Sequence, residues 1–182
     1  FSFILRPVLN AQESSRITLA VAVAVARSLE GIHINNISIK WPNDILIGSK
    51  KVCGILTELS LDSDKVKYVV VGIGLNVNTE KKELPAQATS LKEESGKVFD
   101  IADLSHIIIK EIDLDYQKVL KYHFSEIVQE AKHFSGLILG ERIKVSWQDK
   151  QIQGYAVDFD EYGGLVIRRD NGLLEKVYAG HI

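Results

Sequence analysis

The chain has 182 residues, of which 46% are hydrophobic and 25% are charged, a balance typical of a globular protein with a sizeable core. The net charge of −2 provides no overall basic field of the kind that attracts nucleic acid. The single cysteine excludes an intramolecular disulfide, and the five histidines lack metal-ligand spacing, so we expect no protein-bound metal. The longest apolar stretch, 17–26, is too short to cross a bilayer, and we expect a cytoplasmic protein without a membrane partner.

The first elements are a strand and a helix. Residues 1–7 are short and apolar and end at Pro7, which predicts a strand. Residues 16–29 are apolar on nearly every side, and their VAVAVA run fits an alternating strand as well as a helix. Their length, their alanine content and candidate caps at Ser14 and Ser15 favour a buried helix that ends before Gly31.

Alternating and continuous apolar runs predict a sheet in the following segment. The sequence Gly48-Ser49-Lys50-Lys51 between two such runs has the composition of a hairpin turn. The last run is apolar almost throughout, as in a central buried strand. Strands are therefore predicted at 36–41, 45–47, 52–61 and 65–78, followed by a polar loop at 79–96.

The second half of the chain changes character after residue 135. Helical periodicity covers 101–122, with Leu104, Ile108, Ile112 and Tyr116 on one face, and a second helix is predicted at 124–134. Four short strands follow, at 142–147, 151–159, 165–169 and 174–178, the first pair joined through Asp149-Lys150. We expect an α+β fold: a mixed sheet backed by helices in residues 1–135, and a small β-barrel in residues 136–182.

One face of the predicted strand 65–78 is suited to a ligand. Gly72, Gly74, Asn76 and Asn78 share that face by the period of two. Glycines allow close approach, and asparagines can donate to and accept from a nucleobase or ribose. A bulge or a tight helix-on-sheet contact explains the glycines equally well. A Rossmann site is excluded, because no helix starts after this Gly-x-Gly.

Lysines occur beside two predicted strand ends. Lys40 and Asp44 are four residues apart in KWPND, where Pro42 makes a rigid polar strand end; a surface salt bridge beside a turn is the plainer interpretation. Lys51 precedes Gly54 and can neutralise a carboxylate or phosphate, or it can be a solvated hairpin lysine. Cys53 is predicted to be a small buried hydrophobic residue rather than a nucleophile.

Taken in order, these segments resemble the biotin protein ligase family. The resemblance is carried by KWPND at 40–44, KVCGILTE at 51–58, GIGLNVN at 72–78 and ATSL at 88–91. Each segment alone is a weak signal, and their combination is specific. The resemblance implies a catalytic domain like those of biotin ligases and class II aminoacyl-tRNA synthetases, followed by an SH3-like barrel that helps to dock a carrier protein or to close the nucleotide site.

The resemblance also implies a reaction. Members of this family activate biotin with ATP to biotinyl-5′-AMP and then transfer biotin to a lysine of a carboxylase biotin carboxyl-carrier domain. ATP and biotin are thus the expected substrates, Mg²⁺ the expected cofactor, and the carrier domain the expected partner. By the same resemblance, Lys51 contacts the biotin carboxylate and the α-phosphate, Asp44 orients or deprotonates the incoming amine, and Lys40 adds positive charge near the phosphates.

The implied binding residues surround these three. Gly54 lets the backbone lie against biotin, while Gly72 and Gly74 keep the face open. Asn76 meets the adenylate. Lys51 belongs to both groups, and the predicted binding set is Lys51, Gly54, Gly72, Gly74, Asn76, Trp41 and Asn43.

The chain departs from the family at its start. A Gly/Arg-rich loop, roughly GRGRxGR, precedes the matching first strand in the family, and no such tract occurs in these 182 residues. The chain begins with Phe1 and contains no methionine, so we expect native residues upstream. We therefore expect weak binding and little catalysis from this polypeptide alone. DNA is an expected partner only if a helix-turn-helix domain precedes the sequence, as in some family members.

Several alternatives stay open. A related ligase acts on lipoate or octanoate with the same catalytic fold. A non-catalytic repressor fragment that senses biotinyl-adenylate would be a binding module, and a degenerate paralogue would do neither. Long edge strands would also allow the sheet to form a homodimer.

Overall fold

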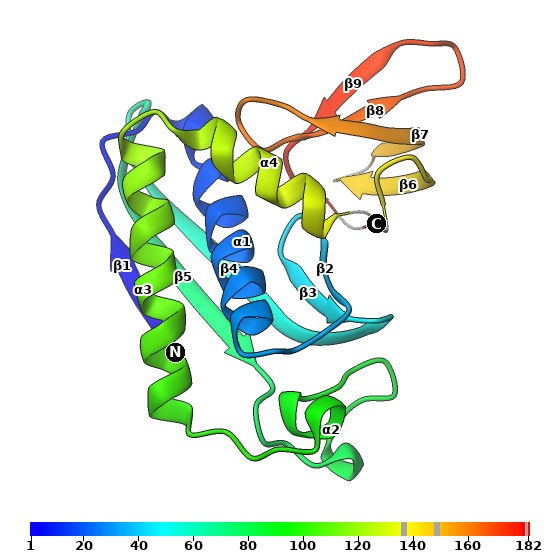
Figure 1. The fold of residues 1–182 in the computed structure, drawn as a ribbon. Helices are drawn as coiled ribbons and strands as arrows, with labels where there is room; N and C mark the ends of the chain where they lie inside the picture. Colours follow the sequence, from blue (N-terminus) through cyan, green and yellow to red (C-terminus); the bar gives the residue numbers. More distant parts are fainter. Residues whose placement is uncertain (136–137, 148–149, 181) are drawn as a thin grey trace.

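The computed structural model describes residues 1–135, 138–147, 150–180 and 182. Within them, a five-stranded sheet carries helices on one face, and a four-stranded sheet lies beside it (Figure 1). This arrangement confirms the α+β class. The predicted boundary after residue 135 adjoins residues that the structure does not describe, and Asp149 of the predicted hairpin turn lies outside the described residues.

The first sheet is antiparallel in every ladder, although we expected mixed strand directions. Short turns join its consecutive strands after the first helix, and short turns can connect only antiparallel neighbours. Its strands, in spatial order, are β1 (Ser2–Leu5), β5 (Lys65–Leu75), β4 (Lys50–Asp62), β3 (Asp44–Ile47) and β2 (Ile37–Lys40).

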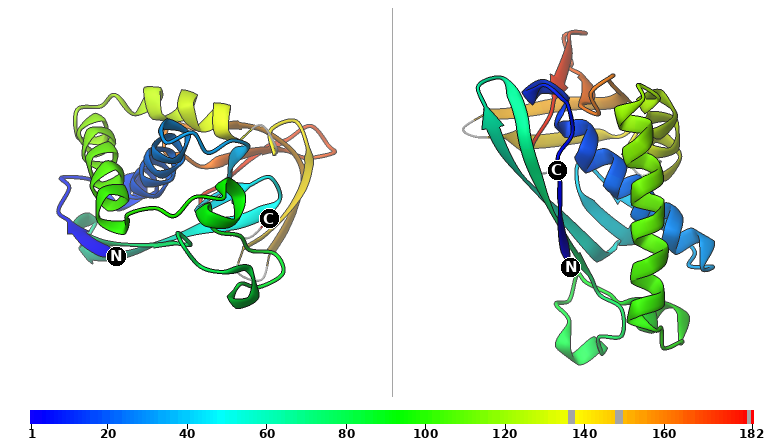
Figure 2. Two further views of the ribbon diagram at one scale, coloured as in Figure 1. Left: turned by 60° about the horizontal axis from the view of Figure 1, so that its bottom comes forward. Right: turned by 90° about the vertical axis from the view of Figure 1, so that its left-hand side faces the viewer.

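Helix α1 (Ser15–Gly31) packs against this sheet and against the helices α3 (Ile101–Leu120) and α4 (Phe124–Phe134), and Figure 2 shows all three helices on the same side of the sheet. Every residue from Leu19 to Ala26 is buried, because α1 has neighbours on all sides. The preference for a helix over a strand is confirmed.

Ser14 occupies the N-cap position of α1 as predicted, but neither Ser14 nor Ser15 caps the helix with its side chain. The Ser14 hydroxyl donates to the Ala11 carbonyl at 2.6 Å, and the Ser15 hydroxyl donates to the Tyr162 carbonyl at 2.7 Å. A short 3-10 turn, η1 (Ala11–Glu13), leads directly into the helix and takes the place of a capped start.

A buried ion cluster joins the helices. Asp115 lies on the inward face of α3 with its side chain fully buried. A guanidinium nitrogen of Arg27 on α1 lies 2.9 Å from one of its oxygens, and the Lys118 ammonium lies 3.3 Å from the other. Burial raises the pKa of Asp115, and the two cations oppose that shift. The helical periodicity placed only apolar residues on this face, so Asp115 was missed.

The segment after β5 is more structured than the predicted polar loop. The strand ends at Leu75, three residues earlier than expected. A 3-10 turn, η2 (Lys81–Glu83), and a short helix, α2 (Leu91–Ser95), follow it. Asn78 lies beyond the strand, where its side chain donates to the Phe99 carbonyl at 2.8 Å and accepts from the Phe99 amide at 3.0 Å.

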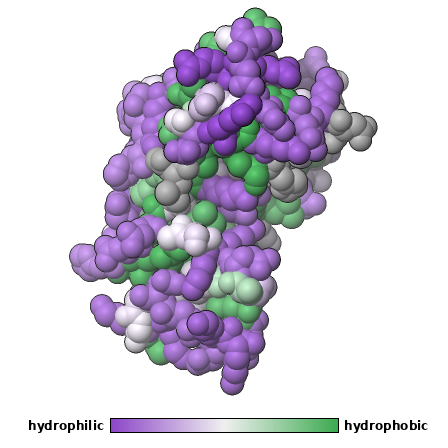
Figure 3. All heavy atoms as spheres, turned by 90° about the vertical axis from the view of Figure 1, so that its right-hand side faces the viewer, coloured by the Kyte–Doolittle hydropathy of each residue, from purple (hydrophilic) through white to green (hydrophobic). Residues whose placement is uncertain are grey.

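The second sheet is open among the described residues, although we expected a barrel. Its order is β6 (Arg142–Trp147), β7 (Lys150–Phe159), β8 (Leu165–Arg168) and β9 (Leu174–Val177). The chain after β9 returns towards β6, since a Cβ on Gly180 would lie 2.7 Å from the Val145 Cγ1. The right-hand side of the molecule shows hydrophobic atoms as separate spots among hydrophilic ones (Figure 3).

The edges of the first sheet are mostly short. The outer strands β1 and β2 have four residues each, so the long strands lie inside the sheet. The part of β4 after Ile55 pairs only with β5 among the described strands, which leaves one longer open edge. Dimerisation through the sheet stays a prediction. In the part of the chain that the structure describes, no helix combines the length and apolar character needed to cross a membrane.

Candidate functional site

A row of predicted site residues crosses four strands of the first sheet. Lys40 on β2 pairs with Asp44 on β3, Asp44 pairs with Gly54 on β4, and Gly54 pairs with Gly74 on β5. Residues paired across antiparallel strands have neighbouring side chains on the same face. The helices pack against the opposite face, which carries Val71 and Ile73, so this row faces away from the core.

A β-bulge brings Lys51 onto the same face. Residues 51 and 54 are three apart and would point to opposite faces of a regular strand. The β3–β4 register skips Val52: Ile45 pairs with Cys53, and Leu46 pairs with Lys51. The extra residue reverses the alternation, as bulges do. Val52 and Cys53 are both buried, while Lys51 points outward.

Lys51 and Asp44 form the centre of the site. The Lys51 ammonium lies 2.6 Å from an Asp44 carboxylate oxygen. A Cβ on Gly54 would lie 3.0 Å from that ammonium and 3.7 Å from the same carboxylate oxygen, so the glycine leaves room for the pair. About half of the Lys51 side chain stays accessible to solvent. The predicted catalytic pair is thus in direct contact.

Two concavities meet at this ion pair. One, of about 600 Å³, is lined by Lys51, Asp44 and the glycines of β4 and β5. The other, of about 760 Å³, is lined by Lys51, Asp44 and Lys40. Asp44 and Lys51 belong to both linings, and they separate a glycine-walled space from a lysine-walled one.

Gly72 and Gly74 leave the first concavity shallow and open. Added Cβ atoms would meet nothing closer than 3.9 Å at Gly72 and 3.8 Å at Gly74. No helix packs on this face within the described residues, so a tight helix-on-sheet contact does not explain the glycines. The prediction that Gly72 and Gly74 lie on the same face of the strand is confirmed.

Asn43 holds the strand end that carries Asp44. Its side-chain amide donates to the Ile55 carbonyl at 2.6 Å, and the Ile55 amide donates to the Asn43 carbonyl at 2.9 Å. These bonds attach the KWPND segment to β4. Asn43 also lines the glycine-walled concavity.

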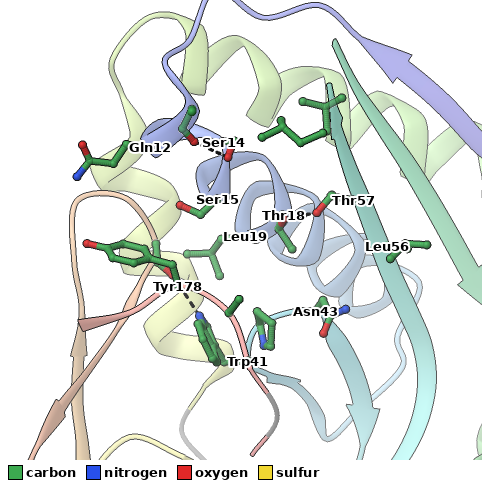
Figure 4. Close-up of a pocket in the computed structure, with 16 residues that line it drawn as sticks. Gln12, Ser14, Ser15, Thr18, Leu19, Trp41, Asn43, Leu56, Thr57 and Tyr178 are labelled. Atoms are coloured by element: carbon green, nitrogen blue, oxygen red, sulfur yellow. Dashed lines mark hydrogen bonds between the residues drawn. The ribbon is translucent and has the colours of Figure 1, made fainter. Parts of the chain in front are cut away.

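Trp41 lies at the contact between the two sheets. It is buried, and its indole nitrogen donates to the Gly163 carbonyl in the β7–β8 turn at 3.2 Å (Figure 4). A third pocket, of about 450 Å³, opens here between Trp41, Tyr178 and the start of α1. Trp41 lines neither concavity at the ion pair, so its part in ligand binding stays a prediction.

Asn76 is also separate from the two concavities. Its side-chain amide donates to the Thr89 carbonyl at 3.0 Å, just beyond the end of β5. The Thr89 amide in turn donates to the Lys51 carbonyl at 2.9 Å, and the Lys51 amide donates to the Gln87 carbonyl at 2.9 Å. Asn76 therefore braces the loop beside Lys51, and its contact with an adenylate stays a prediction.

Several residues that line the two concavities were not among the predicted site residues. Leu56 lies two residues after Gly54 and shares its face, a position that the strand period would have identified. Phe1 and Ser2, at the start of β1, join the same lining, and Gln87 joins the lysine-walled one. No local signal marks these three, because sheet pairing and loop packing bring them there.

The titratable groups at the site do not suggest a metal centre. Among the described residues, no three His, Cys, Asp or Glu side chains come close enough to hold a metal ion. Asp44 is the carboxylate at the ion pair and already has a cationic partner. Burial raises the pKa of the nearby Cys53 thiol to about 12, which supports its predicted role as a small buried residue.

Comparison with known proteins decides the family. The model of the biotin/lipoate A/B protein ligase family matches residues 1–76, and that of the biotin protein ligase C terminal domain matches residues 138–182. The structure of the biotin protein ligase from Aquifex aeolicus in complex with biotin and ATP is similar over 100% of this chain and 75% of that chain, with a TM-score of 0.82 and 32% identity. The chain belongs to the biotin protein ligase family.

Curated relatives agree with this assignment. The bifunctional ligase/repressor BirA of Bacillus spizizenii (strain W23) is 34% identical over 185 residues, which are 100% of this chain and 56% of that protein. The biotin--[acetyl-CoA-carboxylase] ligase of Mycobacterium tuberculosis (strain H37Rv) is 28% identical over 156 residues, 83% of this chain and 56% of that protein. The chain thus spans little more than half the length of these relatives.

Proposed function

We propose that this chain forms the Lys51 part of a biotin protein ligase site, which makes biotinyl-5′-AMP from biotin and ATP and transfers biotin to a lysine of a carboxylase carrier domain. The observation that carries the proposal is the Lys51–Asp44 ion pair at the junction of two concavities. Family membership supports it, and so does the relative solved with biotin and ATP.

The first step joins two anions. A biotin carboxylate oxygen attacks the α-phosphorus of ATP, and the bond to the pyrophosphate oxygen breaks. A carboxylate in the glycine-walled concavity and phosphates beside Lys40 would both lie near the Lys51 ammonium, which reduces their repulsion and stabilises charge on the phosphoryl oxygens. Holding both reactants together supplies the rest of the catalysis.

The second step consumes the adenylate. The carrier lysine amine attacks the acyl carbon, AMP leaves with the bonding electrons, and the amine loses a proton. Asp44 can accept a hydrogen bond or a proton from that amine, because its carboxylate lies on the open face at the junction. Lys51 would then neutralise the departing AMP.

The remaining requirements concern partners and location. The described residues do not fit a protein-held magnesium ion, because the carboxylate at the junction is already paired with Lys51. Mg²⁺ enters the proposal only with the phosphates of ATP, as is usual for this ion. A cytoplasmic location, where ATP is abundant and thiols stay reduced, fits the single buried cysteine. A homodimer and a DNA-binding segment stay predictions.

The deciding experiment is acid-dependent exchange between ATP and pyrophosphate. It is run on the 182-residue chain and on the full-length gene product, with biotin, lipoate and octanoate in parallel. Exchange with biotin alone supports the proposal. Exchange with lipoate or octanoate instead indicates the related ligase that acts on those acids. If the full-length gene product exchanges with none of them, a repressor module or a degenerate paralogue replaces the ligase.

Two lysine variants test the assignment within that assay. Lys51→Ala should abolish exchange, because the shared cation is lost. Lys50→Ala is the matched control, since Lys50 is an exposed neighbour at the start of the same strand. Equal exchange by the Lys51→Ala and Lys50→Ala variants would remove Lys51 from the mechanism.

A further inference from the structure

A buried carboxylate organises the turn between β7 and β8. One oxygen of Asp160 accepts hydrogen bonds from the backbone amides of Tyr162 and Gly164, both at 2.9 Å. Its other oxygen accepts from the Tyr178 hydroxyl at 2.6 Å and lies 3.4 Å from the Lys176 ammonium. With only 4% of its side chain exposed, Asp160 fixes this turn to β9 and to the segment that follows β9.

The turn is pressed against the first sheet and its helices. Gly163 has a positive φ of 82°, and a Cβ there would lie 3.2 Å from Leu19 on α1 and 3.3 Å from Phe124 on α4. Its carbonyl accepts the hydrogen bond from the Trp41 indole. In Figure 4, Tyr178 and Trp41 lie on the same side of the pocket, next to this bond.

Trp41 leads directly to the site through the backbone. Pro42 and Asn43 follow it, and Asp44 begins β3. Lys51 is held differently, by backbone hydrogen bonds to Gln87 and Thr89 in the loop that follows β5. A displacement of Trp41 would therefore reach Asp44 before it reached Lys51.

We propose that Asp160 is a positioning residue for the second step: it fixes Gly163, which holds Trp41 and so places Asp44 for the incoming lysine. This inference rests on the proposed function, because Asp44 is the group assigned to that lysine. It makes the second sheet part of the transfer step through a specific chain of contacts. The effect of Asp160 should be larger on transfer than on adenylate formation.

The first test observes Trp41 directly and does not depend on catalysis. The chain has two tryptophans, so Trp147→Phe leaves Trp41 as the fluorescent reporter. In that background, Asp160→Asn should shift the emission to longer wavelength and increase quenching by acrylamide, while far-UV circular dichroism stays unchanged. Unchanged emission and quenching would overturn the proposal.

Two variants control this measurement. Asp158 lies at the end of β7, two residues before Asp160, and its carboxylate pairs with Lys132. Asp158→Asn should therefore leave Trp41 unaffected. Tyr178→Phe removes one hydrogen bond of Asp160 and should act in the same direction as Asp160→Asn, but less strongly. It provides the test if Asp160→Asn does not fold. Equal shifts from Asp158→Asn and Asp160→Asn would contradict a specific role for Asp160.

The second test separates the two steps in the full-length gene product. Asp160→Asn should slow transfer from preformed biotinyl-adenylate by about tenfold and change adenylate formation by less than about twofold, since small misplacements mainly affect the group displaced. Equal losses in both steps would indicate a general structural role and overturn the proposal.

A double-mutant cycle tests the route through Trp41. Trp41→Phe removes the indole donor, so adding Asp160→Asn should slow transfer little further. If the two substitutions instead slow transfer by factors that multiply, Asp160 does not act through Trp41. An absence of adenylate formation in the unmodified protein would refute the proposed ligase function, while the fluorescence test would still decide the link between Asp160 and Trp41.

Discussion

The Lys51 ammonium lies 2.6 Å from the Asp44 carboxylate, across a ladder in which regular alternation would have turned Lys51 towards the core. The bulge at Val52 creates this contact, and Gly54 leaves room for it. The pair can exchange partners during a reaction, because a substrate carboxylate or phosphate can compete for Lys51 while an amine competes for Asp44.

Asp44→Asn should separate the two steps. The amide keeps the size of the side chain but cannot accept a proton from the lysine amine, so transfer should fall by about 10²-fold while adenylate formation persists. Single-turnover transfer from preformed biotinyl-adenylate measures the effect in the full-length gene product. Asp62→Asn, an exposed change near the end of β4, is the control. Unchanged transfer by Asp44→Asn would show that Asp44 has no part in this step.

Gly72→Ala and Gly74→Ala should weaken biotin binding without weakening the fold. Each added methyl has room in the free protein but projects into the glycine-walled concavity, and we expect roughly tenfold weaker binding. Titration calorimetry and urea unfolding measure the two quantities. Gly31→Ala, where a Cβ would meet nothing within 4 Å, is the control. Normal affinity in both site variants would place biotin elsewhere.

Arg27→Met should destabilise the protein by about 3 kcal/mol, because it leaves the buried Asp115 carboxylate without its nearest cation. Arg142→Met breaks an ion pair with Asp170 in which both side chains are more than half exposed, and it should cost less than about 1 kcal/mol. Urea unfolding of the two variants gives the comparison. Equal losses would mean that burial of Asp115 does not govern the energetics of the cluster.

The pKa of Asp160 predicts how its contribution to stability depends on pH. Burial alone would raise this pKa, but the hydrogen bonds from Tyr178, Tyr162 and Gly164 and the Lys176 ammonium hold it below the usual 3.8. A lowered carboxyl pKa adds stability that is full above pH 3.8 and disappears as the pH falls through the folded-state value. The difference in unfolding free energy between the unmodified protein and Asp160→Asn should therefore shrink in acid. A constant difference down to the lowest pH at which both fold would contradict this assignment.

Cys53 should be inert in the folded protein. With a pKa of about 12, its thiolate fraction at pH 8 is on the order of 10⁻⁴, and burial adds a steric barrier. Ellman's reagent should react slowly with the native chain and quickly after denaturation. Fast native modification would show that β4 opens readily beside Lys51.

The alternation of residues along a strand predicted correctly which face of the sheet a side chain occupies, wherever the strand pairing is regular. The alternation in β5 placed Gly72 and Gly74 together, because the strand continues unbroken through both. The same rule failed at Asn76 and Asn78, because β5 ends at Leu75 and loop packing then sets their directions. Periodicity contains no information about where a strand loses its partners.

Contacts between distant segments could not be predicted in this way. Trp41 was assigned to the ligand because of its place in KWPND, yet its donor reaches Gly163, 122 residues away. The family resemblance assigned Lys51 to the site, although regular alternation would put Lys51 and Gly54, three residues apart, on opposite faces of the strand. Neither the bulge nor the closeness of the two sheets leaves a mark in local composition.

The bulge at Val52 also has a consequence for comparing and redesigning such proteins. Removing one residue between Lys51 and Gly54 would regularise the ladder and direct the lysine towards the helices. A regular ladder and the contact between Lys51 and Asp44 therefore exclude each other at this single position. A relative with K-x-G instead of K-x-x-G is therefore expected to keep the sheet and lose the contact with the aspartate, and the activity of such a relative would test the proposed role of Lys51.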